Sequence, residues 1–178
     1  MLIHQLRPNH GATVGCKPAY AQGLFSRYGQ SVLVAQKRAS RFVLLAELPS
    51  SQAKPTAAQL HCWPTPLPPQ LRRTLTQDNC TEFPLHHQLR DTLGIDTCFC
   101  NPNSPWQNRG VENANGRVRR FLPRRTNLLH CSSRQIDAIA RQCNNTPRKC
   151  LSFKTPAELF YNHLLRFKRE STYRPSSA

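Results

Sequence analysis

Acidic residues are scarce in this chain. Only 9 Asp and Glu stand against 25 Lys and Arg among 178 residues, which gives a formal net charge of +16 at pH 7. No acid at all precedes Glu47. So lopsided a charge indicates a polyanionic partner, most often nucleic acid. Charge that serves solubility alone is the alternative interpretation.

Long apolar runs are also missing. No run approaches the ~18 residues that a membrane span needs. The first residues, Met1-Leu-Ile-His-Gln-Leu-Arg-Pro8, lack the apolar stretch of a signal peptide. Eight cysteines without an export signal or a Cys-x-x-Cys pair predict reduced thiols rather than a disulfide framework or a zinc site. We therefore expect a cytoplasmic protein that does not associate with membranes.

The hydrophobic pattern alternates between strand-like and helix-like segments. Short β-rich runs predict strands at 30–37, 40–48, 72–77 and 95–100. Helical patterns are found at 52–63, 83–93, 110–122, from 132 or 133 to 145, and from 155 to about 165. Gly94 is expected to cap the second helix, and Thr155-Pro-Ala-Glu158 reads as a capping box. This order predicts an α/β fold, a mixed sheet flanked by helices.

Two carboxylates stand where a metal site can form. Asp78 follows the predicted strand 72–77, at the sheet edge where ligands are often held. Glu112 is expected in the first turn of the helix 110–122, where the helix dipole favours an ionised carboxylate. Two divalent ions bound by carboxylates from distant segments can drive phosphoryl transfer in DNA. Taken alone, this pair is a weak signal, because any Asp and Glu would fit it.

The residues around both carboxylates carry a specific resemblance. Leu75-Thr-Gln-Asp-Asn-Cys-Thr-Glu-Phe83 resembles the "DNG-x-E-F" segment of DDE transposases. Asn103-Ser-Pro-Trp-Gln-Asn-Arg-Gly-Val-Glu-Asn-Ala-Asn-Gly116 resembles their "SPWQ-x-G-x-x-EN-x-x-G" segment. The 33 residues between Asp78 and Glu112 match the spacing of the insertion-sequence-thirty family. Further matching segments are 122–128, 144–151 and 153–160, so the resemblance covers about residues 20–172.

This resemblance implies a retroviral-integrase-like catalytic core with a ribonuclease H-like fold and a five-stranded mixed sheet. Family members bind Mg²⁺ (Mn²⁺ is the substitute), nick element ends and join the freed 3′-hydroxyls to target DNA. It implies Asp78 and Glu112 as catalytic residues and metal ligands, and DNA as partner in a bacterial cytosol or nucleoid. It also implies a homo-oligomer, or a mixed oligomer with intact transposases.

The chain departs from the family pattern at several positions. Members carry a first Asp seven residues before Tyr-Gly-Gln; here Tyr28-Gly29-Gln30 is present, but the position holds Ala21. The Gly after Asp-Asn is replaced by Cys80, and loop residues of the family are replaced by Arg109 and Asn101. Members also begin with a helix-turn-helix region that has no counterpart here. These differences are typical of a truncated and degenerate copy with a vacant third ligand position and weakened metal binding.

The basic residues after Glu112 have a separate interpretation. At helical spacing Gly116 and Arg119 share a face with Glu112, so Gly116 leaves room for a DNA backbone and Arg119 can meet a phosphate. Arg117 and Arg120 are further DNA-binding candidates, although they point elsewhere on the helix. A solvated basic face is the alternative interpretation.

Three segments are expected along the chain: an N-terminal arm or linker remnant at 1–20, the integrase-like core at 21–165, and a basic, frayed tail at 166–178. Two functions follow from the pattern. One is DNA transposition by metal-dependent strand transfer, impaired by the lost first-strand Asp, so that enzymatic activity is an open question. The other is a non-enzymatic nucleic-acid-binding remnant that interferes with intact transposases.

Overall fold

The computed structural model describes residues 19–25, 30–48, 53–64, 67, 69, 72–77, 86–101 and 105–172. The strands are β1 (Ala19–Phe25), β2 (Ser31–Lys37), β3 (Val43–Leu48), β4 (Thr74–Gln77) and β5 (Asp96–Phe99). The helices are α1 (Ala53–Cys62), α2 (His86–Leu93), α3 (Pro105–Val118), α4 (Ser133–Asn145) and α5 (Pro156–Thr172), with short 3-10 turns η2 (Leu128–His130) and η3 (Lys149–Leu151). The α/β class expected from the sequence is confirmed.

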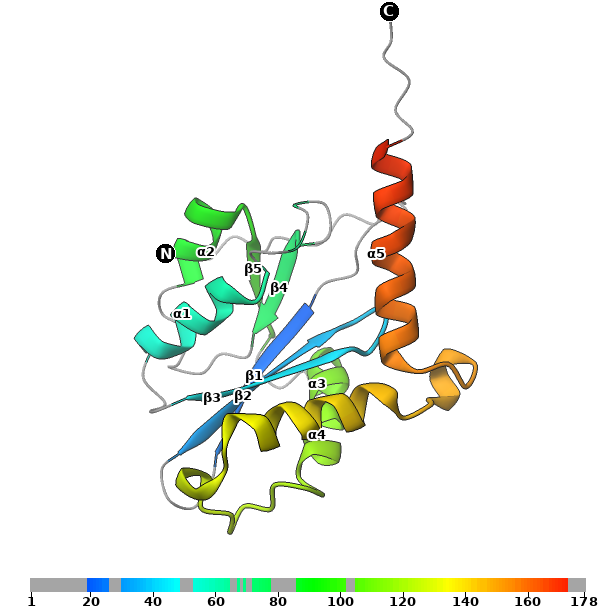
Figure 1. Ribbon diagram of the computed structural model, residues 1–178. Helices are drawn as coiled ribbons and strands as arrows, with labels where there is room; N and C mark the ends of the chain where they lie inside the picture. The colour runs from blue at the N-terminus through cyan, green and yellow to red at the C-terminus, as the bar shows by residue number, and fades with distance from the viewer. Residues whose placement is uncertain are drawn as a thin grey trace, which may run out of the picture.

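The strands form one mixed sheet in the order β3-β2-β1-β4-β5 (Figure 1). The first three run antiparallel to their neighbours along the chain. β4 then lies parallel to β1, and β5 lies parallel to β4. α1 connects β3 to β4, and α2 connects β4 to β5, so these helices supply the crossovers that parallel strands require.

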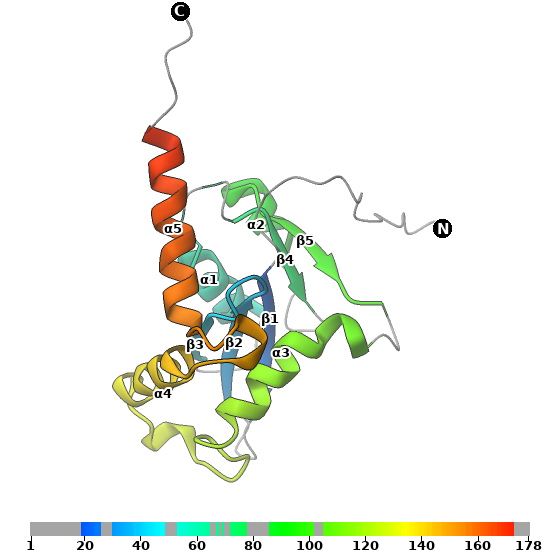
Figure 2. The same ribbon diagram turned by 90° about the vertical axis from the view of Figure 1, so that its right-hand side faces the viewer.

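Apolar side chains cover both faces of this sheet. β2 is buried along almost its whole length, and its alternate residues enter two different cores. Val32 and Val34 pack with α3 and α4, whereas Leu33 and Ala35 pack with α1 and α2. Figure 2 shows α3 running beside β1 and β2 on the first of these faces. A strand buried on both sides reads as a continuous apolar run, which is the pattern of 32–35.

Local capping signals fix several helix ends as the sequence predicts. The hydroxyl of Ser132 accepts from the backbone N–H of Gln135, and the side chain of Gln135 accepts from the N–H of Ser132, so a capping box opens α4. Thr155 and Glu158 exchange the same pair of bonds at the start of α5. Gly94, with φ of +64°, ends α2 in the left-handed conformation.

Three predicted boundaries were wrong. The region 101–110 was expected as a long loop with at most one turn starting at Ser104-Pro105, but the continuous helix α3 begins at Pro105, a residue well suited to a first helical turn. α3 ends at Val118 rather than near residue 122, because the N–H groups of Arg120 and Phe121 bond three residues back and turn Leu122 into the core. α5 continues to Thr172, seven residues beyond the expected end, because no Gly or Pro interrupts 165–172.

The segment boundaries deduced from composition stay predictions. β1 begins at Ala19, two residues before the expected start of the core. The basic residues 166–169, expected in a frayed tail, are the last turns of α5. Among the described residues no helix is long and apolar enough to cross a membrane.

Candidate nucleic-acid interface

Ala21, which the family resemblance marks as a vacant ligand position, lies beside the end of β4. In the parallel pairing of β1 with β4, Ala21 is the Cα partner of Gln77. Gln77 is the last residue of β4 and immediately precedes Asp78 in the sequence. Asp78 itself lies outside the described residues, as does Cys80, so the predicted carboxylate pair has no measured geometry. The register nevertheless puts the backbone of Ala21 next to the strand end that leads to Asp78.

Gln77 is an unusual residue to find at this strand end. Its side chain is 0% exposed, yet neither its Oε1 nor its Nε2 has a hydrogen-bond partner. Buried amides are normally hydrogen-bonded, and leaving one unpaired costs free energy. The end of β4 therefore carries a buried polar side chain without a hydrogen-bond partner.

Glu112 lies on α3 in the middle of the helix. Because α3 begins at Pro105, Glu112 is two turns from the N-terminus, and the expectation that the helix dipole stabilises it in the first turn was wrong. Its side chain is exposed, next to the fully buried Val111 that anchors the helix on the sheet. α3 packs against β1 and β2, so Glu112 extends from the helix that covers the strand carrying Ala21.

Gly116 and Arg119 keep the helical spacing from Glu112. The backbone N–H of Arg119 donates to the carbonyl of Asn115 at 2.8 Å, which continues the helical bonding one residue past α3. Gly116 is exposed, and a Cβ added there would meet nothing within 4 Å. The space expected over Gly116 is therefore present. Burial, followed by the nearby charge of Arg124, lowers the pKa of Arg119 from its ordinary value.

The two other basic candidates occupy different environments. Arg120 is exposed on the turn that follows α3. Arg117 is half-buried, and its Nε has no hydrogen-bond partner. Burial is the largest cause that lowers the pKa of Arg117, and the charges of Arg148 and Arg41 lower it further. Arg41 and Arg148 do not stand out in the sequence, because both are far from Glu112 along the chain.

The metal-ligand set is only partly described. Within the described part of the chain, no three His, Cys, Asp or Glu side chains come together as a metal site. Glu112 is the described member of the predicted pair, and alanine at position 21 has no side-chain oxygen to offer a hard cation. These donors fit a divalent ion less well than three carboxylates would. The six described cysteines form no disulfide bond.

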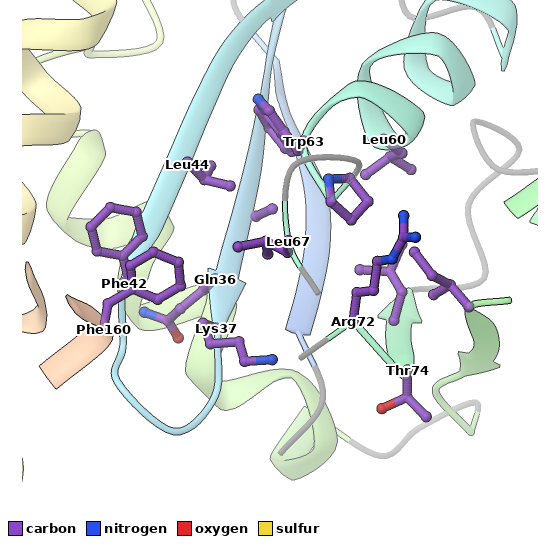
Figure 3. A pocket seen from close by; sticks show the side chains of 14 residues that line it. Gln36, Lys37, Phe42, Leu44, Leu60, Trp63, Leu67, Arg72, Thr74 and Phe160 are labelled. Carbon is purple, nitrogen blue, oxygen red and sulfur yellow. The ribbon is translucent and has the colours of Figure 1, made fainter. Parts of the chain in front are cut away.

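A separate cavity of about 90 Å³ opens on the layer of α1 and α2 (Figure 3). Apolar side chains such as Trp63 and Leu60 line it, and Phe42 stacks on Phe160 at its rim with ring centroids 4.3 Å apart. Arg72 reaches into this lining with two buried nitrogens that lack hydrogen-bond partners. None of the described site candidates lines the cavity, which lies by the start of β4 rather than by its end.

Comparison with known proteins shows what the chain is similar to. It is 36% identical over 122 residues to the transposase InsI of insertion sequence element IS30A from Escherichia coli strain K12, a match covering 68% of this chain and 32% of the relative. It is 38% identical over 129 residues to the transposase of IS1086 from Cupriavidus metallidurans, covering 72% and 38%. It is 32% identical over 130 residues to the transposase of IS4351 from Bacteroides fragilis, covering 73% and 40%.

The chain matches no protein-family profile. The matched region also spans only about a third to two fifths of the length of these relatives, so most of each relative has no matching counterpart here.

Proposed function

Because this chain is a relative of the insertion-sequence-thirty transposases, we propose that it is a transposase core of ribonuclease H-like fold that binds DNA. Its ancestral reaction is DNA transposition by metal-dependent strand transfer. In this chain that reaction is impaired, because one of three metal-binding carboxylates is missing. The observation that carries the proposal is the register of β1 and β4, which sets Ala21 beside the strand end leading to Asp78.

The sheet topology supports this fold. Three antiparallel strands are followed by two strands parallel to the first, with helices on both faces. In this arrangement the end of β4 lies beside β1, and α3 packs across β1 from one face. The strand end that precedes Asp78 in the sequence and the helix that carries Glu112 thereby border the same strand.

Asp78 and Glu112 are the residues that would hold Mg²⁺ or Mn²⁺. When bound, such ions activate the attacking oxygen and stabilise the leaving oxygen in phosphoryl transfer. Ala21 cannot contribute a third carboxylate, and Mg²⁺ replaces a lost ligand poorly because it demands near-octahedral geometry. Arg119, one turn beyond Gly116 on the exposed side of α3, is suited to a DNA phosphate beside the carboxylates.

A nicking assay tests the impairment. The chain, fused to a generic DNA-binding module, is incubated with element-end DNA and Mg²⁺ or Mn²⁺. We expect nicking and strand transfer at least about 10³-fold below an intact relative, which corresponds to roughly 4 kcal/mol of lost transition-state stabilisation. Ala21→Asp should restore activity most, and Cys80→Gly should add to it by relieving the turn after Asp78. Efficient nicking by the unaltered chain that Asp78→Asn abolishes would refute the impairment.

The high positive charge favours a second candidate function, a non-enzymatic DNA-binding remnant that interferes with intact transposases by mixed assembly. Its DNA affinity should be largely independent of sequence, in the range of roughly 10⁻⁴–10⁻⁶ M near physiological salt, because phosphates supply the binding energy. Arg119→Ala should reduce the slope of log K against log salt by about one contact. Strong preference for one duplex sequence, or affinity that does not change with salt, would contradict this function.

A further inference from the structure

Three arginines from separate parts of the chain converge on the face of the sheet that α3 and α4 cover. Arg41 lies in the turn between β2 and β3, Arg117 in the last turn of α3, and Arg148 directly before η3. We call this group the arginine cluster. The charges of Arg41 and Arg148 both act on the guanidinium of Arg117.

The fold brings these like charges together through specific bonds. The side chain of Asn144 on α4 accepts from the N–H of Val43 and donates to its carbonyl, each at 2.8 Å, which ties the end of α4 to the strand that follows Arg41. Nη2 of Arg148 donates to the carbonyl of Cys143 at 2.8 Å. Cys143 packs in the same core as Val118, the residue after Arg117. Backbone and core contacts thus hold the cluster against its own repulsion.

No carboxylate compensates this charge among the described residues. The groups whose charges act on Arg117 are the two other arginines and the thiols of Cys143 and Cys150. The Nε atoms of Arg117 and Arg148 are buried and have no hydrogen-bond partner. Half-buried guanidiniums are normally paired with anions, since an unpaired charge that loses water is costly. The cluster is therefore a cationic site with unused donors.

The backbone around the cluster is strained. Among the described residues, the non-glycine positions with positive φ are Arg41 at 61°, Ser152 at 54° and Phe153 at 62°. All three belong to the two turns that carry Arg41 and Arg148. The η3 turn closes on Arg148, whose carbonyl accepts from the N–H of Phe153 at 2.9 Å. Such strain gathers at functional sites more often than elsewhere.

We propose that Arg41, Arg117 and Arg148 form a binding site for a phosphate group, separate from the site that contains Glu112. Guanidinium groups offer forked donors that match the oxygens of a phosphate, and three of them would neutralise its charge. Arg117 is five residues from Glu112 on α3, and Glu112 is not among the groups whose charges act on Arg117. The phosphate belongs either to a nucleic-acid backbone or to a small free phosphate compound.

The first arm of the test uses pyrophosphate, which carries adjacent phosphates but no base or sugar. Binding to the full chain is measured by isothermal titration calorimetry at low ionic strength. Arg117→Gln should weaken binding at least about 10-fold, because it removes charge-assisted hydrogen bonds. Arg134→Gln is the matched control: it removes one exposed arginine on α4 outside the cluster and should leave the affinity within about twofold.

The second arm measures duplex DNA binding across a range of salt concentrations. Arg117→Gln should lower the slope of log K against log salt by about 0.9 if a backbone phosphate occupies the cluster, and Arg134→Gln should not. Arg117→Lys keeps the charge but loses the fork, so it should keep the slope and still weaken pyrophosphate binding. Circular dichroism and thermal unfolding verify that Arg117→Gln folds like the unaltered chain.

The two arms together distinguish a nucleic-acid phosphate from a free phosphate compound, and they test whether the arginine cluster binds phosphate. Losses in both arms identify nucleic acid as the source of the phosphate, whereas a loss confined to pyrophosphate identifies a free phosphate compound. If Arg117→Gln changes neither measurement more than Arg134→Gln does, the proposed site is refuted. The site does not rest on the proposed function, because the pyrophosphate arm gives its answer even for a chain that binds no DNA.

Discussion

Asn144→Ala should destabilise the fold strongly, because Asn144 closes an open edge of the sheet. β3 is the outermost strand, and both backbone polar groups of Val43 are bonded by the amide of Asn144 rather than by another strand. Asn144 is 5% exposed, so water does not readily replace the lost amide. Each buried backbone group left without a partner costs about 1–3 kcal/mol, and two are affected. We therefore expect a loss of about 2–6 kcal/mol in the free energy of unfolding.

Chemical denaturation followed by circular dichroism measures this loss. Asn145→Ala is the matched control, because Asn145 is the next residue on α4 and is exposed. It should change the free energy of unfolding by less than about 0.5 kcal/mol. If Asn144→Ala costs less than about 1 kcal/mol, the two bonds to Val43 do not hold the edge strand and the reasoning is wrong.

Three further predictions concern local features. Ser132→Ala should cost about 1 kcal/mol of stability by removing the cap of α4, whereas Ser133→Ala, one residue into the helix, should cost much less; thermal unfolding compares them. Phe153→Gly should stabilise the chain by up to about 1 kcal/mol in the same assay, because Phe153 is 72% exposed at a φ of 62°, and a loss would show that its ring is needed. Burial raises the pKa of Cys143 despite the opposing charges of Arg148 and Arg117, so at pH 8 an alkylating reagent should modify exposed Cys150 at least about 10-fold faster than Cys143. Because the thiol of Cys143 ionises at lower pH in the unfolded chain than in the folded one, its contribution to stability should be lost as the pH rises above about 9. Equal alkylation rates of Cys143 and Cys150 would contradict the raised pKa of Cys143.

Elements whose signals are local were readable in the sequence. The capping box at Thr155 needs only residues three apart, and Gly94 ends its helix through its own backbone freedom. The sequence also predicted a cap for α4 at Ser132 or Ser133, and the structure places it at Ser132. The β-rich run at 31–35 predicted a strand, and the structure buries that strand on both faces. The boundaries of α3 were not readable, because Trp106 and its neighbours lack a strong helical pattern and the tight turn after Val118 serves to bury Leu122.

Some features of the candidate site were also readable in the sequence, and others were not. The family resemblance indicated Glu112, and helical spacing from Glu112 indicated Gly116 and Arg119. No acid precedes Glu47, so the first-strand carboxylate that the resemblance leads one to expect is not found in the sequence. The comparisons support the family resemblance on which those residues were chosen. The roles of the individual residues stay predictions, since Asp78 lies outside the described part.

By itself, then, the sequence determined what depends on residue type and short spacing: the positive charge, several helix caps, and the alternation of strands and helices. Only the tertiary structure decided which distant residues meet. The pairing of Ala21 with Gln77, the bonds between Val43 and Asn144 across 101 residues, and the effect of Arg41 and Arg148 on Arg117 all arise from sheet register and helix packing. Such contacts leave no local pattern, because each partner alone is an ordinary residue and its role appears only when the chain folds.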